Sequence, residues 1–188
     1  MSATGESRDS IFQQLQKSER AAEELIIGLS PLQVNWRPNA SAWSICQCLD
    51  HLARTNRIYC QAMLESIAQQ RQGISATAAA TPGWFGRKFV EKMEPQTHTR
   101  FKAVKKVIPA ADGDAQAALQ DFLNSHSDVR RVMASWEQMD FNRVRFRNPF
   151  VPLLRFTVAT GLLIINAHDR RHLWQAERVK VSDAFPAA

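Results

Sequence analysis

Apolar residues recur every three or four positions in four long segments of the chain, which is the spacing of one face of an amphipathic helix. Two of these segments open on residues that cap helices. Ser44 and Gln47 form a capping-box pattern, and Asp114 is a good N-cap. The sequence therefore predicts four long helices, over residues 6–29, 44–70, 114–139 and 157–180.

The stretches between these helices are less regular. Within 71–113, a proline-glycine turn signal precedes a segment that fits a short helix, 84–93, and another that looks extended, 102–109. We expect 71–113 to be one long crossover connection that joins antiparallel neighbours across the end of a bundle. Loops of this length are often functional. Residues 141–150 alternate apolar and basic side chains, so an extended segment or a hairpin is expected there.

Four long helices with one long crossover predict an all-α fold, a four-helix bundle. The chain has 188 residues, 45% of them hydrophobic and 22% charged, which is enough to bury one core of ordinary size. A single domain over 1–188 is therefore expected, with residues 1–7 flexible.

The sequence is typical of a cytoplasmic protein. The N-terminus lacks the apolar core of a secretory signal, and the longest apolar stretch, 156–167, is too short and too polar to span a membrane. The cysteines Cys46, Cys48 and Cys60 fall in one predicted helix, where Cys46 and Cys48 point in nearly opposite directions and cannot bridge each other. A reducing compartment accounts for them most simply.

The net charge of +6 requires nucleic acid to be considered as a partner. The chain has no aromatic-interleaved basic strand, no zinc-finger spacing and no basic zipper helix, so no nucleic-acid partner is expected. Arg143, Arg145 and Arg147 are interpreted as a solvated edge. The weaker alternative is that they rim the mouth of a site and attract an anionic thiol or substrate.

Two histidines of the fourth predicted helix carry the candidate chemistry. His168 and His172 occupy heptad rows that should face the core, one turn apart on one face, where two imidazoles can reach one metal ion. Two buried imidazoles without partners would be costly, and a metal ion is the most economical partner. A histidine pair at this spacing also arises by chance, so the prediction of a metal site requires a third ligand. From spacing alone the candidates are His51, His98 and His126.

A set of spaced residues resembles the motifs of a known family: Trp43, Ser44, His51, Leu52, His168, His172 and Gln175. A tryptophan-serine helix start, a histidine-leucine pair seven residues after the serine, and a late histidine pair followed by glutamine are similar to the DinB/YfiT-like superfamily. The resemblance covers nearly the whole chain. It implies a four-helix bundle with up-down-down-up wiring. It also implies that His51, His168 and His172 hold one divalent metal ion, which could be zinc, nickel or iron.

Two further residues are expected to support these ligands. Gln175 follows His172 by one turn and is a candidate to orient a ligand. His126 lies on the core stripe of its helix but has no counterpart among the family's ligands, so a packing or supporting role is expected.

Cys48 is interpreted as a small buried hydrophobe. The tryptophans are expected to serve core or lid packing: Trp36, Trp43, Trp136 and Trp174.

The predicted function follows from the charge of such a site. Three neutral histidines leave the ion with open positions, where a bound water or thiol would lose its proton near neutral pH and act as the nucleophile. No Asp or Glu is expected on the inward faces of the helices, since Glu65, Asp121 and Glu137 are interpreted as outward or terminal. This absence of a separate base favours a thiolate over a water.

The family includes thiol S-transferases, a thiol-dependent isomerase and proteins described as metal-dependent hydrolases. The resemblance therefore implies a metal-dependent enzyme with thiol S-transferase-like or hydrolase-like activity on a small molecule, and a low-molecular-weight thiol as a partner. A homodimer is left open. The alternative function is a non-catalytic, stress-associated bundle that binds a metal.

Overall fold

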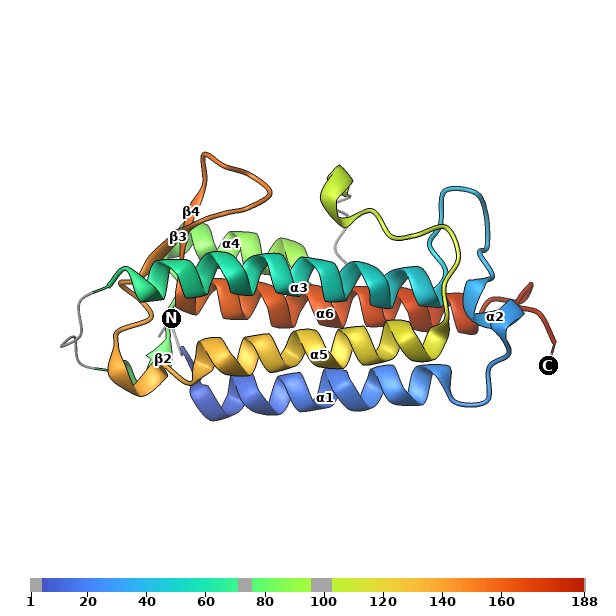
Figure 1. Ribbon diagram of the computed structural model, residues 1–188, viewed down its shortest axis with the longest axis horizontal. Helices are drawn as coiled ribbons and strands as arrows, with labels where there is room; N and C mark the ends of the chain where they lie inside the picture. The colour runs from blue at the N-terminus through green and yellow to red at the C-terminus, as the bar shows by residue number, and fades with distance from the viewer. Residues whose placement is uncertain (1–4, 71–75, 96–102, 188) are drawn as a thin grey trace.

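Four long helices lie side by side and make up the body of the protein (Figure 1). The computed structural model describes residues 5–70, 76–95 and 103–187. The long helices are α1 (Arg8–Ile26), α3 (Ile45–Ala68), α5 (Ala115–Met133) and α6 (Val158–Lys180). The predicted all-α four-helix bundle is confirmed. No helix of the described residues is long and apolar enough to cross a membrane.

The predicted helix starts are confirmed by their caps. Ser44 accepts a hydrogen bond from the amide of Gln47, whose side chain in turn reaches the backbone of Ser44. Asp114 accepts from the amide of Ala117 at the start of α5. The end of α5 differs from the prediction, because the helix stops at Met133 and a 3-10 turn, η2 (Trp136–Gln138), follows it.

The long helices run in two directions (Figure 1). The ends of α1 and α6 lie together, since Lys180 Nζ donates to the carbonyl of Leu25 at 2.9 Å. The starts of α3 and α5 lie together, since the Cys46 thiol contacts the carbonyl of Asp114 at 3.7 Å. Each of these pairs is therefore parallel, and the two pairs run in opposite directions.

The parallel course of α3 and α5 corrects the expected path of the connection between them. That connection does not join antiparallel neighbours across one end of the bundle. A helix of 24 residues such as α3 is about 36 Å long, so the chain must return along the whole bundle before α5 begins. The return includes the predicted short helix, confirmed as α4 (Trp84–Met93), which packs on α6.

Two smaller expectations are also corrected in this region. The segment expected to be extended contains a 3-10 turn, η1 (Lys105–Val107). Residues 1–7 were expected to be flexible. Residues 1–4 lie outside the described residues, but at Glu6 and Ser7 the short strand β1 (Glu6–Ser7) pairs antiparallel with β2 (Ala79–Ala80). In this pairing the backbone N–H and C=O groups of the two strands bond to each other, whereas in a flexible tail they would bond to water.

A hairpin directly precedes α6 and packs against α3. Its strands are β3 (Arg145–Arg147) and β4 (Arg155–Thr157), paired antiparallel with Phe146 opposite Phe156. Both phenylalanines are buried and the flanking arginines are exposed, so the predicted alternation is confirmed. Gly161 permits the close approach of this hairpin to α6, because a Cβ there would lie 2.9 Å from the Phe146 ring.

The core consists of two hydrophobic clusters, one toward each end of the bundle. A layer of buried polar side chains lies between them. Every long helix contributes a side chain to this layer from a position between the two clusters: the half-buried Glu19 on α1, Asn56 on α3, His126 on α5 and Asp169 on α6.

These four side chains form one connected network. His126 donates from Nε2 to Asp169 (3.0 Å) and from Nδ1 to Glu19 (3.1 Å), and Asn56 Nδ2 donates to the other oxygen of Asp169 (3.1 Å). Both ring nitrogens of His126 face carboxylates, which only accept, so the ring is an imidazolium. Burial alone would lower its pKa, but the hydrogen bonds and charges of Asp169 and Glu19 raise the pKa of His126 to about 9.

This raised pKa predicts how stability depends on pH. Because the pKa of His126 is higher in the folded chain, its contribution is fully present below the unfolded pKa of about 6.5 and is lost as pH rises through about 9. At pH 6, His126→Gln should lower the free energy of unfolding by on the order of 3 kcal/mol relative to wild type. Urea unfolding of both proteins should show this difference shrinking by pH 10. A difference that is constant across this range would contradict the paired imidazolium.

Candidate metal centre

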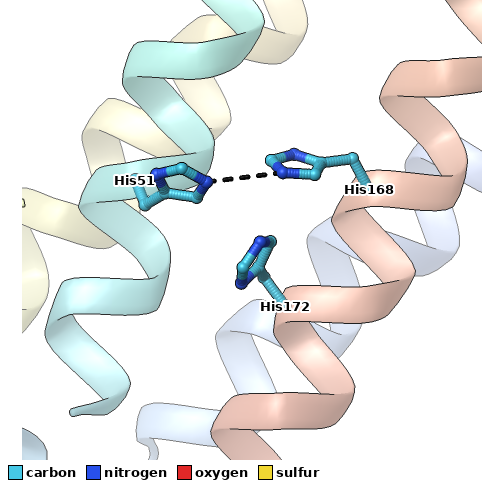
Figure 2. Close-up of side chains that lie close together, drawn as sticks. All are labelled: His51, His168 and His172. Atoms are coloured by element: carbon cyan, nitrogen blue, oxygen red, sulfur yellow. Dashed lines mark hydrogen bonds between the residues drawn. The ribbon is translucent and has the colours of Figure 1, made fainter. Parts of the chain in front are cut away.

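Three histidines from two helices converge on one point (Figure 2). His51 projects from the first half of α3, and His168 and His172 project from successive turns of α6, which packs against α3. Each ring offers a nitrogen, and the three nitrogens lie within 4.8 Å of one another. Within the described part of the chain, the structure thus brings together the three residues that the resemblance implies as ligands.

The spacing of the ring nitrogens fits a metal ion. His51 Nε2 and His168 Nε2 are 3.3 Å apart. Two nitrogens bound about 2.0–2.1 Å from a tetrahedral ion would be separated by roughly 3.3–3.4 Å. His172 closes the triangle, with its ring centroid 4.7 Å from that of His51 and 4.5 Å from that of His168.

The backbone determines which nitrogen His51 presents. Its Nδ1 lies 2.7 Å from the carbonyl oxygen of Val107. A carbonyl only accepts hydrogen bonds, so Nδ1 carries the proton and Nε2 keeps its lone pair for the site. Metal-binding histidines commonly have such an oriented outer partner. Val107 belongs to η1, so the long connection between α3 and α5 contributes directly to the site.

Two nitrogens of the cluster have no protein partner. The Nδ1 atoms of His168 and His172 are buried and make no hydrogen bond within the described residues. Burying polar atoms without partners is costly, and three adjacent imidazoles have few donors to share among themselves. The fit to a cation lies on the inner side of the cluster, where His51 Nε2 has beside it only another imidazole nitrogen, His168 Nε2 at 3.3 Å, and a bound cation would accept the lone pairs of both.

All three histidines are neutral at physiological pH, which is the form that binds metal. Burial lowers the pKa of His51, although its hydrogen bond to Val107 acts in the opposite direction. Burial and the neighbouring charges lower the pKa of His172 to about 3 and that of His168 well below its usual value. A side-chain hydrogen bond with Gln175 acts in the opposite direction and raises the pKa of His172. Gln175 therefore lies beside His172, as expected.

A cavity of about 610 Å³ adjoins the cluster, a size suited to a small molecule. It is bounded by α3, α6, α4, the η1 segment and the turn of the β3–β4 hairpin. Trp43 covers the cluster from one side, with its ring centroid 4.6 Å from His51 and 5.5 Å from His172. Its predicted packing role therefore includes packing on the candidate ligands.

Other residues named from the sequence lie apart from the cluster. His126 contacts Glu19 and Asp169, not the three clustered rings, and His98 lies outside the described residues. Cys48 is fully buried, which raises the pKa of its thiol, and it packs in one of the hydrophobic clusters. The arginines of the hairpin region do not line the cavity: Arg143, Arg145 and Arg147.

Asp169 corrects the expectation that no carboxylate faces inward. It is fully buried, and both of its oxygens are bound, one by Asn56 and one by His126. Its heptad neighbours, Leu162 and Ala176, are fully buried as well, so this row was the signal that could have revealed it. Asp169 does not line the cavity, and no other Asp or Glu of the described residues does so.

Fold and site together define a class of protein: a helical bundle whose two facing helices bring three histidines to the wall of a small-molecule cavity. Comparison of the sequence with known families agrees with this class. The model of the DinB superfamily matches residues 14–176, and the chain belongs to that superfamily.

Two similar proteins come from Bacillus subtilis. The uncharacterized protein YuaE is 27% identical to this chain over 154 residues, which is 81% of this chain and 86% of YuaE. The structure of YfiT is similar with a TM-score of 0.54 and 14% identity, covering 92% of this chain and 85% of YfiT. That likeness shows a shared fold. YfiT is described as a probable metal-dependent hydrolase with an unusual four-helix bundle topology.

The first prediction from this geometry is metal content. Protein expressed with ample metal should carry close to one divalent ion per chain, and His168→Ala with His172→Ala should remove it, because one helix then offers no ligand. Elemental analysis of both proteins measures this directly. Less than about a tenth of an ion in the wild type would refute the site.

A second prediction separates His126 from the ligands. Because His126 contacts Glu19 and Asp169 and none of the clustered rings, His126→Gln should retain the metal, whereas His51→Ala should lose most of it. Both variants are to be compared by elemental analysis after circular dichroism has established that they are folded. A loss in His126→Gln equal to that in His51→Ala would show that the ligand set is wrong.

Proposed function

We propose that the protein is an enzyme that uses one divalent metal ion, zinc, nickel or iron, held by His51, His168 and His172. The observation that carries this proposal is the convergence of three neutral imidazoles on the wall of a 610 Å³ cavity. Structural metal sites in proteins are usually closed by four protein ligands, whereas three ligands beside a cavity are typical of catalytic sites.

The bound ion would supply Lewis acidity, which lowers the pKa of a thiol or water that enters the cavity. The protein supplies no carboxylate at the cavity wall within the described residues, so no side chain of that type is placed to take a proton from water. A thiol ionises with less assistance than water does, since its ordinary pKa is about 8.5. The absence of a carboxylate base from the described cavity wall therefore favours a thiol S-transferase-like reaction.

The far part of the cavity offers a hydrogen-bond donor for the second substrate. Tyr59 lines the cavity, and its hydroxyl accepts a hydrogen bond from Asn148 Nδ2 at 3.0 Å. Burial raises the pKa of Tyr59, so its hydroxyl keeps its proton and can donate it in a hydrogen bond to an oxygen of a bound molecule. Apolar walls from Phe89, Phe150 and Ile164 limit access of water.

A hydrolase is the second candidate. It is favoured by the description of YfiT, which shares the fold, as a probable metal-dependent hydrolase. In that case water would take the place of the thiol, and Tyr59 would serve the oxygen of an ester or amide.

The test compares the metal-loaded wild type with His172→Ala, each incubated with several cellular thiols and a reactive electrophile at pH 7. Lowering a thiol's pKa from about 8.5 to below 7 raises its ionised fraction by roughly tenfold or more, so conjugation by the wild type should exceed that by the variant by a similar factor.

Two other outcomes distinguish the alternatives. Equal conjugation in both proteins, with metal-dependent ester or amide hydrolysis by the wild type alone, would favour the hydrolase. Absence of both activities over a broad panel would favour the non-catalytic metal-binding bundle.

A further inference from the structure

Two buried polar atoms of α3 lie at the cavity without a protein partner. Thr55 is 6% exposed and Asn56 is fully buried, and both residues line the cavity. Neither Thr55 Oγ1 nor Asn56 Oδ1 makes a hydrogen bond within the described residues. In this part of the chain five buried side-chain polar atoms have no partner, and four of them belong to residues of the cavity wall. Buried polar atoms in folded proteins are nearly always paired, so this concentration at one cavity needs a physical explanation.

The orientation of the Asn56 amide follows from its partners. Its Nδ2 lies 3.1 Å from a carboxylate oxygen of Asp169 and 3.4 Å from Ser125 Oγ, and neither of these residues lines the cavity. The carboxylate only accepts, and the Ser125 hydroxyl already donates to the carbonyl of Phe122 at 2.6 Å, so both accept from Asn56. The polar layer therefore uses both amide protons of Asn56, and Oδ1 remains as an acceptor for the cavity.

The two atoms continue a row that begins at the candidate ligand of α3. Residues four apart on a helix lie one turn apart on the same face, so His51, Thr55 and Tyr59 occupy successive turns along the cavity. Thr55 and Asn56 follow His51 by four and five residues, which is about 6–7.5 Å along the helix axis. A small molecule that enters at the histidines can therefore reach both residues.

We infer that Thr55 and Asn56 form a subsite for a neutral substrate group that donates hydrogen bonds, such as a primary amide. This inference rests on the proposed function, because it names a substrate class for the same cavity. Asn56 Oδ1 can only accept, and the Thr55 hydroxyl can also accept, so the pair matches the two protons of an amide nitrogen. A carboxylate group has no proton to offer and would leave Asn56 Oδ1 unpaired.

Tyr59 fits the other half of such a group. Its hydroxyl accepts a hydrogen bond from Asn148, so its own proton is left to donate to the carbonyl of an amide. The cavity wall of α3 thus offers two acceptors and one donor within a little over one helical turn.

A second buried threonine provides a matched control. Thr55→Val keeps the shape of the side chain and removes a hydroxyl that makes no hydrogen bond within the described residues. Thr160 is also buried, but its hydroxyl lies 2.8 Å from Thr157 Oγ1 and it does not line the cavity. Thr160→Val should therefore lower the urea midpoint of unfolding, whereas Thr55→Val should leave that midpoint unchanged or raise it.

The first experiment measures ligand binding in the protein loaded with Co²⁺. The probes are 3-mercaptopropionamide and 4-mercapto-2-butanone, which differ only in an amide NH₂ that a methyl group replaces. The readout is the absorbance that a thiolate produces when it binds Co²⁺. One neutral hydrogen bond changes affinity by roughly two- to tenfold, so the ratio of amide to ketone affinity should fall by that factor in Thr55→Val. The ratio in Thr160→Val should equal that in the wild type.

The second experiment tests the subsite without metal. Metal-free protein labelled with ¹⁵N is titrated with propionamide or with 2-butanone, and NMR chemical shifts give both affinities. The side-chain N–H signals of Asn56 should move with propionamide and much less with 2-butanone. The ratio of the two affinities should again fall in Thr55→Val and not in Thr160→Val.

The outcomes separate the inference from the proposed function. If neither thiol changes the Co²⁺ spectrum, but Thr55→Val weakens the preference of the metal-free protein for propionamide, the subsite stands and a thiol-binding metal centre is refuted. If both thiols bind Co²⁺, but the ratio of amide to ketone affinity is the same in wild type and Thr55→Val, the subsite is overturned and the proposed function stands. A urea midpoint that falls as far in Thr55→Val as in Thr160→Val would show that the Thr55 hydroxyl is structural, which also overturns the subsite.

Discussion

The fold depends on one buried charge, the imidazolium of His126, and on the carboxylates that surround it. Asp169 and Glu19 come from α6 and α1, and Asn56 joins the network from α3, so all four long helices meet in one polar layer. Removing one member of a buried ion pair commonly costs about 3–5 kcal/mol, because the partner is left charged and unpaired. The helices can therefore rotate or slide very little without a large loss of stability.

This constraint also orients the candidate metal centre. Neighbouring residues on a helix point about 100° apart, so directing Asp169 toward His126 turns His168 to a different side of α6, the side that faces His51. His172 follows one turn later on that side. The remaining degree of freedom, the orientation of the His51 ring, is determined by the carbonyl of Val107. Rigid helices thus place the rings, and a single loop carbonyl selects the nitrogen that is presented.

The features that could be predicted from the sequence are those that depend on the spacing of residues close together in the chain. Helix caps such as Ser44 and Asp114 and the pairing of His168 with His172 depend on residues within one or two turns of each other. The inward carboxylate of Asp169 was missed because nearly every residue in the first half of α6 is buried, so the heptad row of Leu162 and Ala176 does not stand out from its neighbours. The partners of His126 are 43 and 107 residues away, and no local pattern encodes such contacts. The choice of His51 required the family resemblance for the same reason.

The chemistry of the cavity follows from how the structure distributes its carboxylates. Both oxygens of Asp169 are bound within the polar layer, and Glu19 is held by His126 and by Arg130 at 2.6 Å. These acids neutralise the imidazolium and are unavailable to the cavity on the other side of α6. The cavity wall is left with neutral imidazoles and the guanidinium of Arg171, and within the described residues it has no acid. A metal ion held there would keep most of its charge, because imidazoles do not neutralise it as carboxylate ligands would. The same arrangement that stabilises the bundle therefore leaves the described wall of the cavity without a carboxylate base, and the proposed preference for an easily ionised nucleophile rests on this property.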